Sequence, residues 1–182
     1  MRLPIIAGNW KMYKTIDETI ELATSLRSLL KDIPDDRVEI IICPTFVNLH
    51  AAAGIIKGSN IKLGAQNLYP KQEGAYTGEI SPLMLRSVGC SYVIIGHSER
   101  RQYFNETNEF INEKVKSAIE YGLLPIMCVG EKLEEREKGL TFDVVKDHVV
   151  NGLKGISKEK VLHVVIAYEP VWAIGTGKTA TP

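Results

Sequence analysis

The chain has 182 residues, of which 45% are hydrophobic and 24% charged, and its formal net charge is +0. This length is enough to bury the core of one globular domain. The balanced charge argues against nucleic acid or an anionic membrane surface as a partner. No apolar run approaches the length of a membrane span, and residues 1–8 lack the long apolar region of a signal peptide.

Cysteine and histidine usage indicates a cytoplasmic protein without a metal centre. Cys43, Cys90 and Cys128 are odd in number, widely spaced and free of any C-x-x-C pair. This usage is typical of reduced thiols in the cytoplasm. No two of the four histidines stand in an i, i+4 pair. We therefore expect no zinc site.

Six strand-like apolar runs are separated, in most cases, by helical patterns, with a spacing of roughly 30 residues that is typical of βα units. The runs begin near Leu3, Val38, Ile61, Tyr92, Leu124 and Val161. Such an alternation predicts an α/β fold with a parallel sheet.

Helix starts are marked by two local signals. Residues 15–18 form a capping box, and Ser81-Pro82 places a cap before a first-turn proline. Amphipathic patterns predict further helices over residues 108–121 and 141–153, the second with Phe142 on its apolar face.

Two polar stretches have different interpretations. The charged run at residues 131–138 is most simply a solvated helix face with i, i+4 ion pairs. Residues 66–79 form a long polar loop containing Gly74 and Gly78. Loops of that length in a compact domain are usually functional or interfacial.

The most informative stretch is residues 161–181, where an apolar run predicts a buried strand that ends just before Glu169. A carboxylate there, beside a loop with stiff edges and an apolar tip, suggests a base with a closing lid. The lid would exclude water and hold a small anion on its backbone amides. It would comprise Pro170, Val171, Trp172, Ala173, Ile174, Gly175, Thr176, Gly177 and Lys178.

Nucleotide binding is the rival interpretation of this stretch. A P-loop would need a glycine where Trp172 stands. A dinucleotide fingerprint is met by Gly175, Gly177 and Ala180, but it should follow its strand directly, and residues 169–174 intervene. The lid is therefore the better interpretation.

Polar residues recur just beyond the predicted strands, at the ends that gather active sites in parallel α/β proteins. They are Asn9, Lys11, Gln66, Asn67, His97, Ser98, Glu99, Cys128, Glu131 and Glu169. Singly each has an ordinary explanation: a structural histidine, a surface lysine, a turn asparagine or a solvated loop acid. Cys128 is expected to be a buried packing residue, because no adjacent base would activate it.

Five segments together resemble the triosephosphate isomerase family. They are AGNWKM at 7–12, AQN at 65–67 with GAYTGE at 74–79, IGHSERR at 95–101, CVGE at 128–131 and AYEPVWAIGTGK at 167–178. They occur in the family's order over the whole chain. The resemblance implies a (βα)8 TIM barrel of which six βα units are represented, and neither metal nor organic cofactor.

The resemblance implies roles for two residues in interconverting dihydroxyacetone phosphate and D-glyceraldehyde 3-phosphate, a step of glycolysis and gluconeogenesis. Glu169 would be the base that moves a proton between adjacent carbons through an enediolate. His97 would be the electrophile, in a family where a helix N-terminus keeps this imidazole neutral. Ser98 could open such a helix.

The resemblance also implies supporting roles. Lys11 would place positive charge near the phosphate and the enediolate, Asn9 would supply a neutral donor, and Glu99 would pair with Lys11. Gly175 would offer its N–H to the phosphate of the small triose substrate once the lid closes.

Residues 66–79 resemble the family segment that inserts into a neighbouring subunit, which implies a cytoplasmic homodimer in the complete protein. Tyr76, Thr77 and Gly78 would lie at that interface. An internally packed surface loop is the alternative.

The end of the chain departs from the family pattern. Thr181 and Pro182 predict the start of another helix where the sequence stops. We expect a single barrel domain over residues 1–182 that is truncated before its last two strands. Impaired activity follows from that expectation, and an inactive fragment acting as an assembly or binding module is the alternative function.

Overall fold

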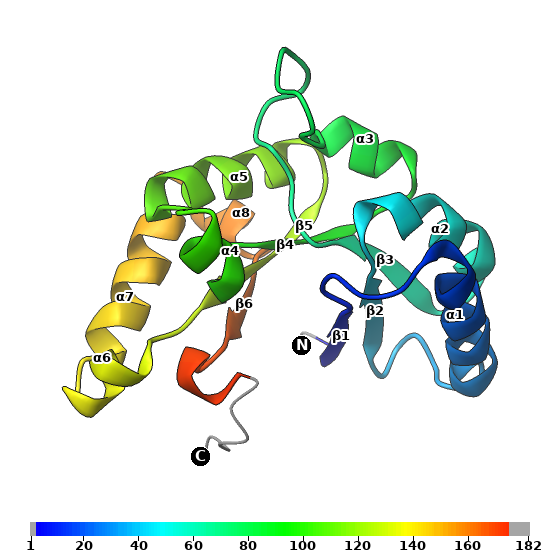
Figure 1. Cartoon of the computed structure of the whole chain (residues 1–182), viewed down its shortest axis with the longest axis horizontal. Helices are drawn as coiled ribbons and strands as arrows, with labels where there is room; N and C mark the ends of the chain where they lie inside the picture. Colours follow the sequence, from blue (N-terminus) through cyan, green and yellow to red (C-terminus); the bar gives the residue numbers. More distant parts are fainter. Residues whose placement is uncertain (1–2, 175–182) are drawn as a thin grey trace. The chain divides into compact units, whose positions relative to one another are not determined.

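A computed structural model describes residues 3–174, which fall into two compact units. The first comprises residues 3–94 with Tyr121–Leu123, and the second comprises Ile95–Glu120 with residues 124–174. Each unit combines strands and helices (Figure 1). The strands paired within each unit run parallel.

The first unit contains four strands paired in chain order. Its elements are β1 (Ile5–Asn9), α1 (Ile16–Leu30), β2 (Glu39–Cys43), η1 (Phe46–Asn48), α2 (Leu49–Ile56), β3 (Ile61–Ala65), α3 (Pro82–Ser87) and β4 (Tyr92–Ile95). The last residue of β4 belongs to the second unit. The register places Ala7 opposite Ile41 and Gly64 opposite Tyr92.

Both predicted helix starts of the first unit are confirmed. The Glu18 carboxylate accepts the Thr15 N–H at 2.8 Å, and the Thr15 hydroxyl accepts the Glu18 N–H, which completes the capping box of α1. The Ser81 hydroxyl caps α3. Helices α1 and α2 lie side by side (Figure 1), where Ala23 and Ala52 are fully buried. Small side chains therefore let these helices approach closely.

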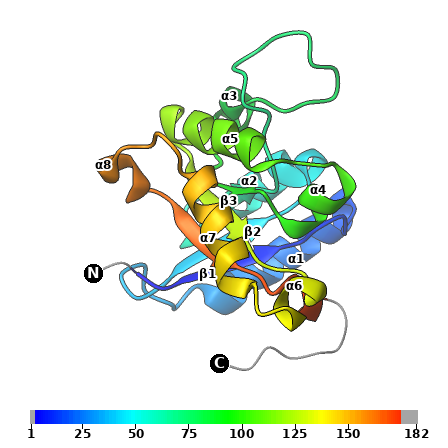
Figure 2. The same ribbon diagram turned by 90° about the vertical axis from the view of Figure 1, so that its left-hand side faces the viewer.

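The second unit has one parallel strand pair. Its elements are α4 (Ser98–Tyr103), α5 (Asn108–Glu120), β5 (Leu124–Val129), α6 (Leu133–Glu137), α7 (Thr141–Gly152), α8 (Lys158–Val161), β6 (Val165–Tyr168) and η2 (Val171–Ala173). Strands β5 and β6 align Met127 with Ile166. Helices α5 and α7 pack on each other and on β5 (Figure 2), with Ile111 and Val115 fully buried.

Two predictions about the second unit are wrong. Val161 does not start a strand, because the Ser157 hydroxyl caps the short helix α8, and β6 begins only at Val165. Phe142 is 87% exposed. Helix α7 comes close to β5 at Gly152, where an added Cβ would lie 2.6 Å from the Met127 sulfur. Phe142 lies ten residues earlier, about 15 Å along the helix axis.

The thiols are free and buried, and burial raises the pKa of Cys43 and Cys90 to about 12. Thiols of this kind are poor nucleophiles. Within residues 3–174, no cluster of three or more histidine, cysteine, aspartate or glutamate side chains could hold a metal ion. The same residues include no helix long and apolar enough to cross a membrane.

Candidate active site

His97 follows β4 and is buried, with 5% of its surface exposed. Its side chain caps α4, because the imidazole Nδ1 accepts the Glu99 N–H at 3.2 Å. The Glu99 carboxylate lies 3.4 Å from the same nitrogen. An Nδ1 that accepts a hydrogen bond carries no proton, so the neutral ring carries its proton on Nε2. Ser98 opens α4, as the sequence predicted.

Glu169 follows β6 and faces His97 within the second unit. Its N–H donates to the Val129 carbonyl at 2.8 Å, which extends the β5–β6 ladder beyond the strand ends. The Oε2 atom lies 3.4 Å from the imidazole Nε2 of His97. Among residues 3–174 this oxygen has no hydrogen-bond partner. A buried carboxylate oxygen left without a donor is suited to accept a proton.

Lys11 and Asn9 form a strained turn after β1 in the first unit. Lys11 has φ +50°, a conformation that costs a non-glycine residue free energy and is often found at functional sites. The Asn9 side chain accepts the Lys11 N–H at 3.0 Å. The Gln66 amide donates to the carbonyls of Lys11 and Cys43, at 2.8 and 2.9 Å. Side chains from β1 and from the end of β3 therefore hold the lysine backbone.

Comparison with known proteins gives a consistent result. The family model for triosephosphate isomerase matches residues 4–182. Proteins named triosephosphate isomerase from Caldanaerobacter subterraneus subsp. tengcongensis and Clostridium botulinum are each 58% identical to the chain. The protein of that name from Dictyoglomus turgidum is 59% identical. These matches cover 99–100% of the chain and 72% of each relative.

The chain belongs to the triosephosphate isomerase family. The match confirms the predicted α/β class, with six βα units of the TIM-barrel fold, and the prediction of an isomerase. The nucleotide-binding alternative has no support from these comparisons.

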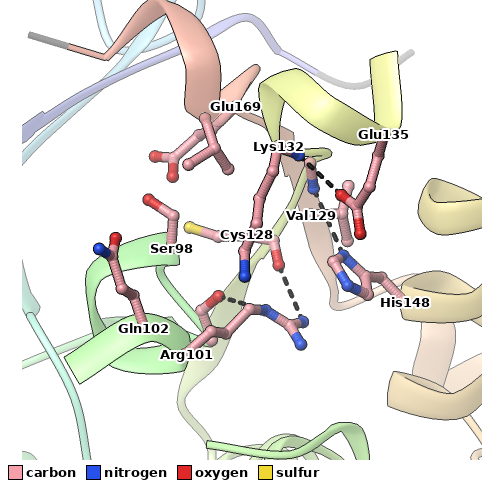
Figure 3. A pocket seen from close by; sticks show the side chains of 12 residues that line it. Ser98, Arg101, Gln102, Cys128, Val129, Lys132, Glu135, His148 and Glu169 are labelled. Atoms are coloured by element: carbon pink, nitrogen blue, oxygen red, sulfur yellow. Dashed lines mark hydrogen bonds between the residues drawn. The ribbon is translucent and has the colours of Figure 1, made fainter. Parts of the chain in front are cut away.

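The second unit has a cavity of about 210 Å³ beside Glu169. Figure 3 shows Ser98 and Cys128 near the Glu169 carboxylate and Arg101 on the opposite side. Cys128 is buried, as predicted. His148 also lines the cavity, and its Nδ1 accepts the Gly130 N–H at 3.4 Å. Burial lowers the pKa of His148 and favours its neutral form.

Glu131 is the largest departure from the sequence prediction. It lies before α6 and is 0% exposed, so its assignment to a solvated face was wrong. The Tyr168 hydroxyl donates to the two carboxylate oxygens at 3.1 and 3.0 Å, and the Trp172 indole N–H donates at 3.0 Å. Burial acts to raise the pKa of Glu131, but these donors, its own backbone N–H and Arg136 outweigh burial and hold the pKa below its usual value.

We call residues 170–174 the lid root. The Val171 N–H donates to the Glu131 carbonyl at 3.1 Å, and the Arg136 guanidinium lies 4.5 Å from the Trp172 ring centre. Glu131 thus contacts the lid root through its backbone and its side chain. Its place beyond a predicted strand had put Glu131 among the candidate site residues, but the charged run that begins with it led to its assignment to a solvated face. Gly175, Thr176, Gly177 and Lys178 lie outside the described residues, so their roles stay predictions.

Proposed function

We propose that Glu169 is the base and His97 the electrophile in the interconversion of dihydroxyacetone phosphate and D-glyceraldehyde 3-phosphate. Glu169 would take a proton from one carbon and return it to the adjacent carbon of an enediolate. The His97 Nε2–H would polarise the carbonyl and move protons between the two oxygens. The observation that carries this proposal is the 3.4 Å approach of the Glu169 Oε2 to the His97 Nε2.

The hydrogen bond to Nδ1 supports the role of His97. An imidazole whose Nδ1 accepts the Glu99 N–H presents Nε2–H on its other side. That proton faces the region where a carbonyl oxygen must lie if Glu169 is to reach the neighbouring carbon. The same ring, after donating the proton, can accept another at Nε2, so one group serves both oxygens.

Lys11 and Asn9 are proposed as the remaining substrate-binding groups of the described chain. Lys11 would add positive charge beside the phosphate and the developing enediolate, where fixed charge favours the transition state. The φ of +50° at Lys11 and the clamp by Gln66 support a fixed backbone there. Because the Asn9 side chain accepts the Lys11 N–H, its amide NH2 group is its donor toward substrate. The pairing of Glu99 with Lys11 and the phosphate contact of Gly175 stay predictions.

The decisive experiment is isomerase activity with Glu169→Gln and His97→Gln measured in parallel. Each substitution should lower kcat by about 10² to 10⁴, the usual contribution of a general acid or base. Exchange of the substrate C–H hydrogen with solvent deuterium should be lost with Glu169→Gln. Glu134→Gln, an exposed residue of α6, is the control. Full activity of Glu169→Gln would refute the role of the base.

We also propose that the protein is a cytoplasmic homodimer in which residues 71–79 contact a second copy. These residues are exposed, and the Tyr76 ring packs at a tilt of 38° against the Tyr69 ring, with ring centres 4.4 Å apart. Beside the Lys11 turn, the first unit carries a groove of about 670 Å³ where Met12 is 92% exposed. An apolar groove of this kind supports an interface. Light scattering should show a dimer that Thr77→Arg dissociates, whereas Lys62→Arg, an exposed position on β3, should leave it intact.

Residues 1–182 are proposed to form a single barrel domain. The chain has two tryptophans, Trp10 in the first unit and Trp172 in the second. Unfolding in urea, followed by the fluorescence of Trp10 in a Trp172→Phe variant and by circular dichroism, should give one coincident transition. Separate transitions would mean that the two units fold independently.

A further inference from the structure

Arg101, on α4, donates to three acceptors that come from different elements. Its Nε lies 2.9 Å from the Gly96 carbonyl, and one terminal nitrogen lies 2.7 Å from the Asn108 side-chain oxygen. The other terminal nitrogen lies 3.4 Å from the Cys128 carbonyl. In Figure 3 the guanidinium points away from the Glu169 carboxylate and toward the Cys128 carbonyl. Arg101 therefore acts on the backbone around the site and not on the reacting groups.

The bond to Gly96 has a particular consequence for His97. Gly96 has φ +71°, and a Cβ there would lie 2.8 Å from the Ile111 side chain, so the position requires glycine. Glycine also leaves the backbone free to rotate. The Gly96 carbonyl belongs to the peptide that carries the His97 N–H, so rotation of that peptide would reorient the imidazole. The Arg101 Nε–H holds this carbonyl in one direction.

The third acceptor links the same guanidinium to the Glu169 side of the site. Cys128 pairs with Ala167 in the β5–β6 register, and the next carbonyl, that of Val129, accepts the Glu169 N–H. One planar cation thus contacts the carbonyl before His97 and the strand end that holds Glu169. The relative position of the two groups depends on both contacts.

A second layer supports the arginine. The Asn108 amide that receives one Arg101 N–H donates to the Asp147 carboxylate at 2.8 Å, and Asp147 also accepts from Asn151 at 2.7 Å. Burial lowers the pKa of Arg101, while the carboxylates of Glu106 and Asp147 act in the opposite direction. The acceptors and nearby carboxylates compensate for burying this cation.

We propose that Arg101 is a positioning residue that sets the tautomer and orientation of His97 relative to Glu169, acting through the carbonyls of Gly96 and Cys128. This inference rests on the proposed roles of His97 and Glu169. The arrangement requires arginine, because three diverging acceptors match a planar fork of donors and do not match the single ammonium of lysine. Asn108 and Asp147 assist by orienting the fork.

The test is an Arg101→Lys variant of the full chain labelled with ¹⁵N-histidine. In the parent protein the His97 signals should show an unprotonated Nδ1 and a protonated Nε2, assigned by comparison with His97→Gln. In Arg101→Lys the two nitrogen shifts should move toward each other as tautomers and orientations mix. The kcat should fall between about tenfold and a hundredfold, as for small misplacements of catalytic groups, with KM unchanged.

Three further variants test whether the effect of Arg101→Lys is specific to its contacts. Arg27→Lys makes the same exchange at an arginine that donates to the Ile55 carbonyl at 2.8 Å in the first unit, and it should leave the His97 signals and kcat unchanged. Asn108→Ala should reproduce part of the Arg101→Lys effect, and Asp147→Ala less, because Asp147 is exposed. Asn108→Ala also serves as the test if Arg101→Lys fails to fold.

Two results would overturn the proposal. The first is unchanged His97 signals in a folded Arg101→Lys variant, even if its melting temperature falls, because Arg101 would then be only structural. The second is altered signals with unchanged kcat where His97→Gln abolishes activity. Altered signals in a protein whose activity does not depend on His97 would refute the proposed catalytic role and leave the positioning intact. The two failures are therefore distinguishable.

Discussion

Glu106 and Glu131 are both buried carboxylates of the second unit, but their surroundings differ. Glu106 accepts from two cations, Lys114 at 2.5 Å and Arg100 at 2.6 Å. Glu131 accepts mainly from neutral donors, the Tyr168 hydroxyl and the Trp172 indole. The Arg136 nitrogen is farther away, at 3.4 Å, on a side chain that is 42% exposed.

The position of the partners suggests what each carboxylate does. Arg100 and Lys114 belong to α4 and α5, so Glu106 holds two helices together. Tyr168 ends β6 and Trp172 lies within the lid root, so Glu131 holds the base of a loop. We infer that Glu106 mainly determines stability, whereas Glu131 also determines where the lid root lies.

The largest expected effect is that of Lys114→Met, which leaves Glu106 buried beside a single cation. Breaking a buried ion pair from one side costs about 3–5 kcal/mol of unfolding free energy. Urea denaturation measures the loss. Lys116→Met, an exposed lysine of the same helix, should change it by less than about 0.5 kcal/mol. A loss below about 1 kcal/mol for Lys114→Met would contradict the structural role of the cluster.

Glu131→Gln should have a smaller effect on stability and a measurable effect on turnover. A neutral amide keeps one acceptor oxygen and turns an NH2 group toward the Tyr168 hydroxyl, so about 1–3 kcal/mol should be lost. The Val171 bond to the Glu131 carbonyl remains, which should keep the lid root folded. Steady-state kinetics should show a lower kcat. Full kcat in Glu131→Gln would mean that Glu131 contributes to stability alone.

The pH dependence separates the contribution of the Glu131 charge. The pKa of Glu131 is lowered in the folded chain, so its stabilisation is present above the unfolded pKa of about 4.3 and is lost as pH falls through the folded pKa. The difference in unfolding free energy between the parent and Glu131→Gln should therefore be largest near neutral pH and shrink below about pH 4. Urea titrations at several pH values measure this difference. A difference that grows in acid would contradict a lowered pKa of Glu131 in the folded chain.

A smaller effect is expected of Trp172→Phe, which removes one donor to Glu131 and keeps an aromatic ring beside Arg136. About 1 kcal/mol should be lost, the usual net contribution of one hydrogen bond. Arg136→Met should cost less, because its ion pair is long and half exposed. Equal losses in Trp172→Phe and Lys114→Met would remove the distinction between the two carboxylates.

Much of the fold and the centre of the site could be predicted without coordinates. The capping box at Thr15 and the cap at Ser81 were confirmed because such signals lie within three residues of one another. The placement of His97 and Glu169 beyond parallel strands was also correct, since the side chains that follow parallel strands gather at one edge of the sheet.

Burial and partner choice were determined by tertiary structure. Glu131 is surrounded by charged neighbours in sequence, but its donors Tyr168 and Trp172 are 37 and 41 residues away. Phe142 has the periodicity of a buried residue, yet it lies at the opposite end of α7 from Gly152, where the helix comes close to β5. Arg101 is part of a recognisable motif, but the acceptors that define its role come from α5 and β5. Local pattern specifies which elements form, whereas contacts between distant residues decide which charges those elements enclose.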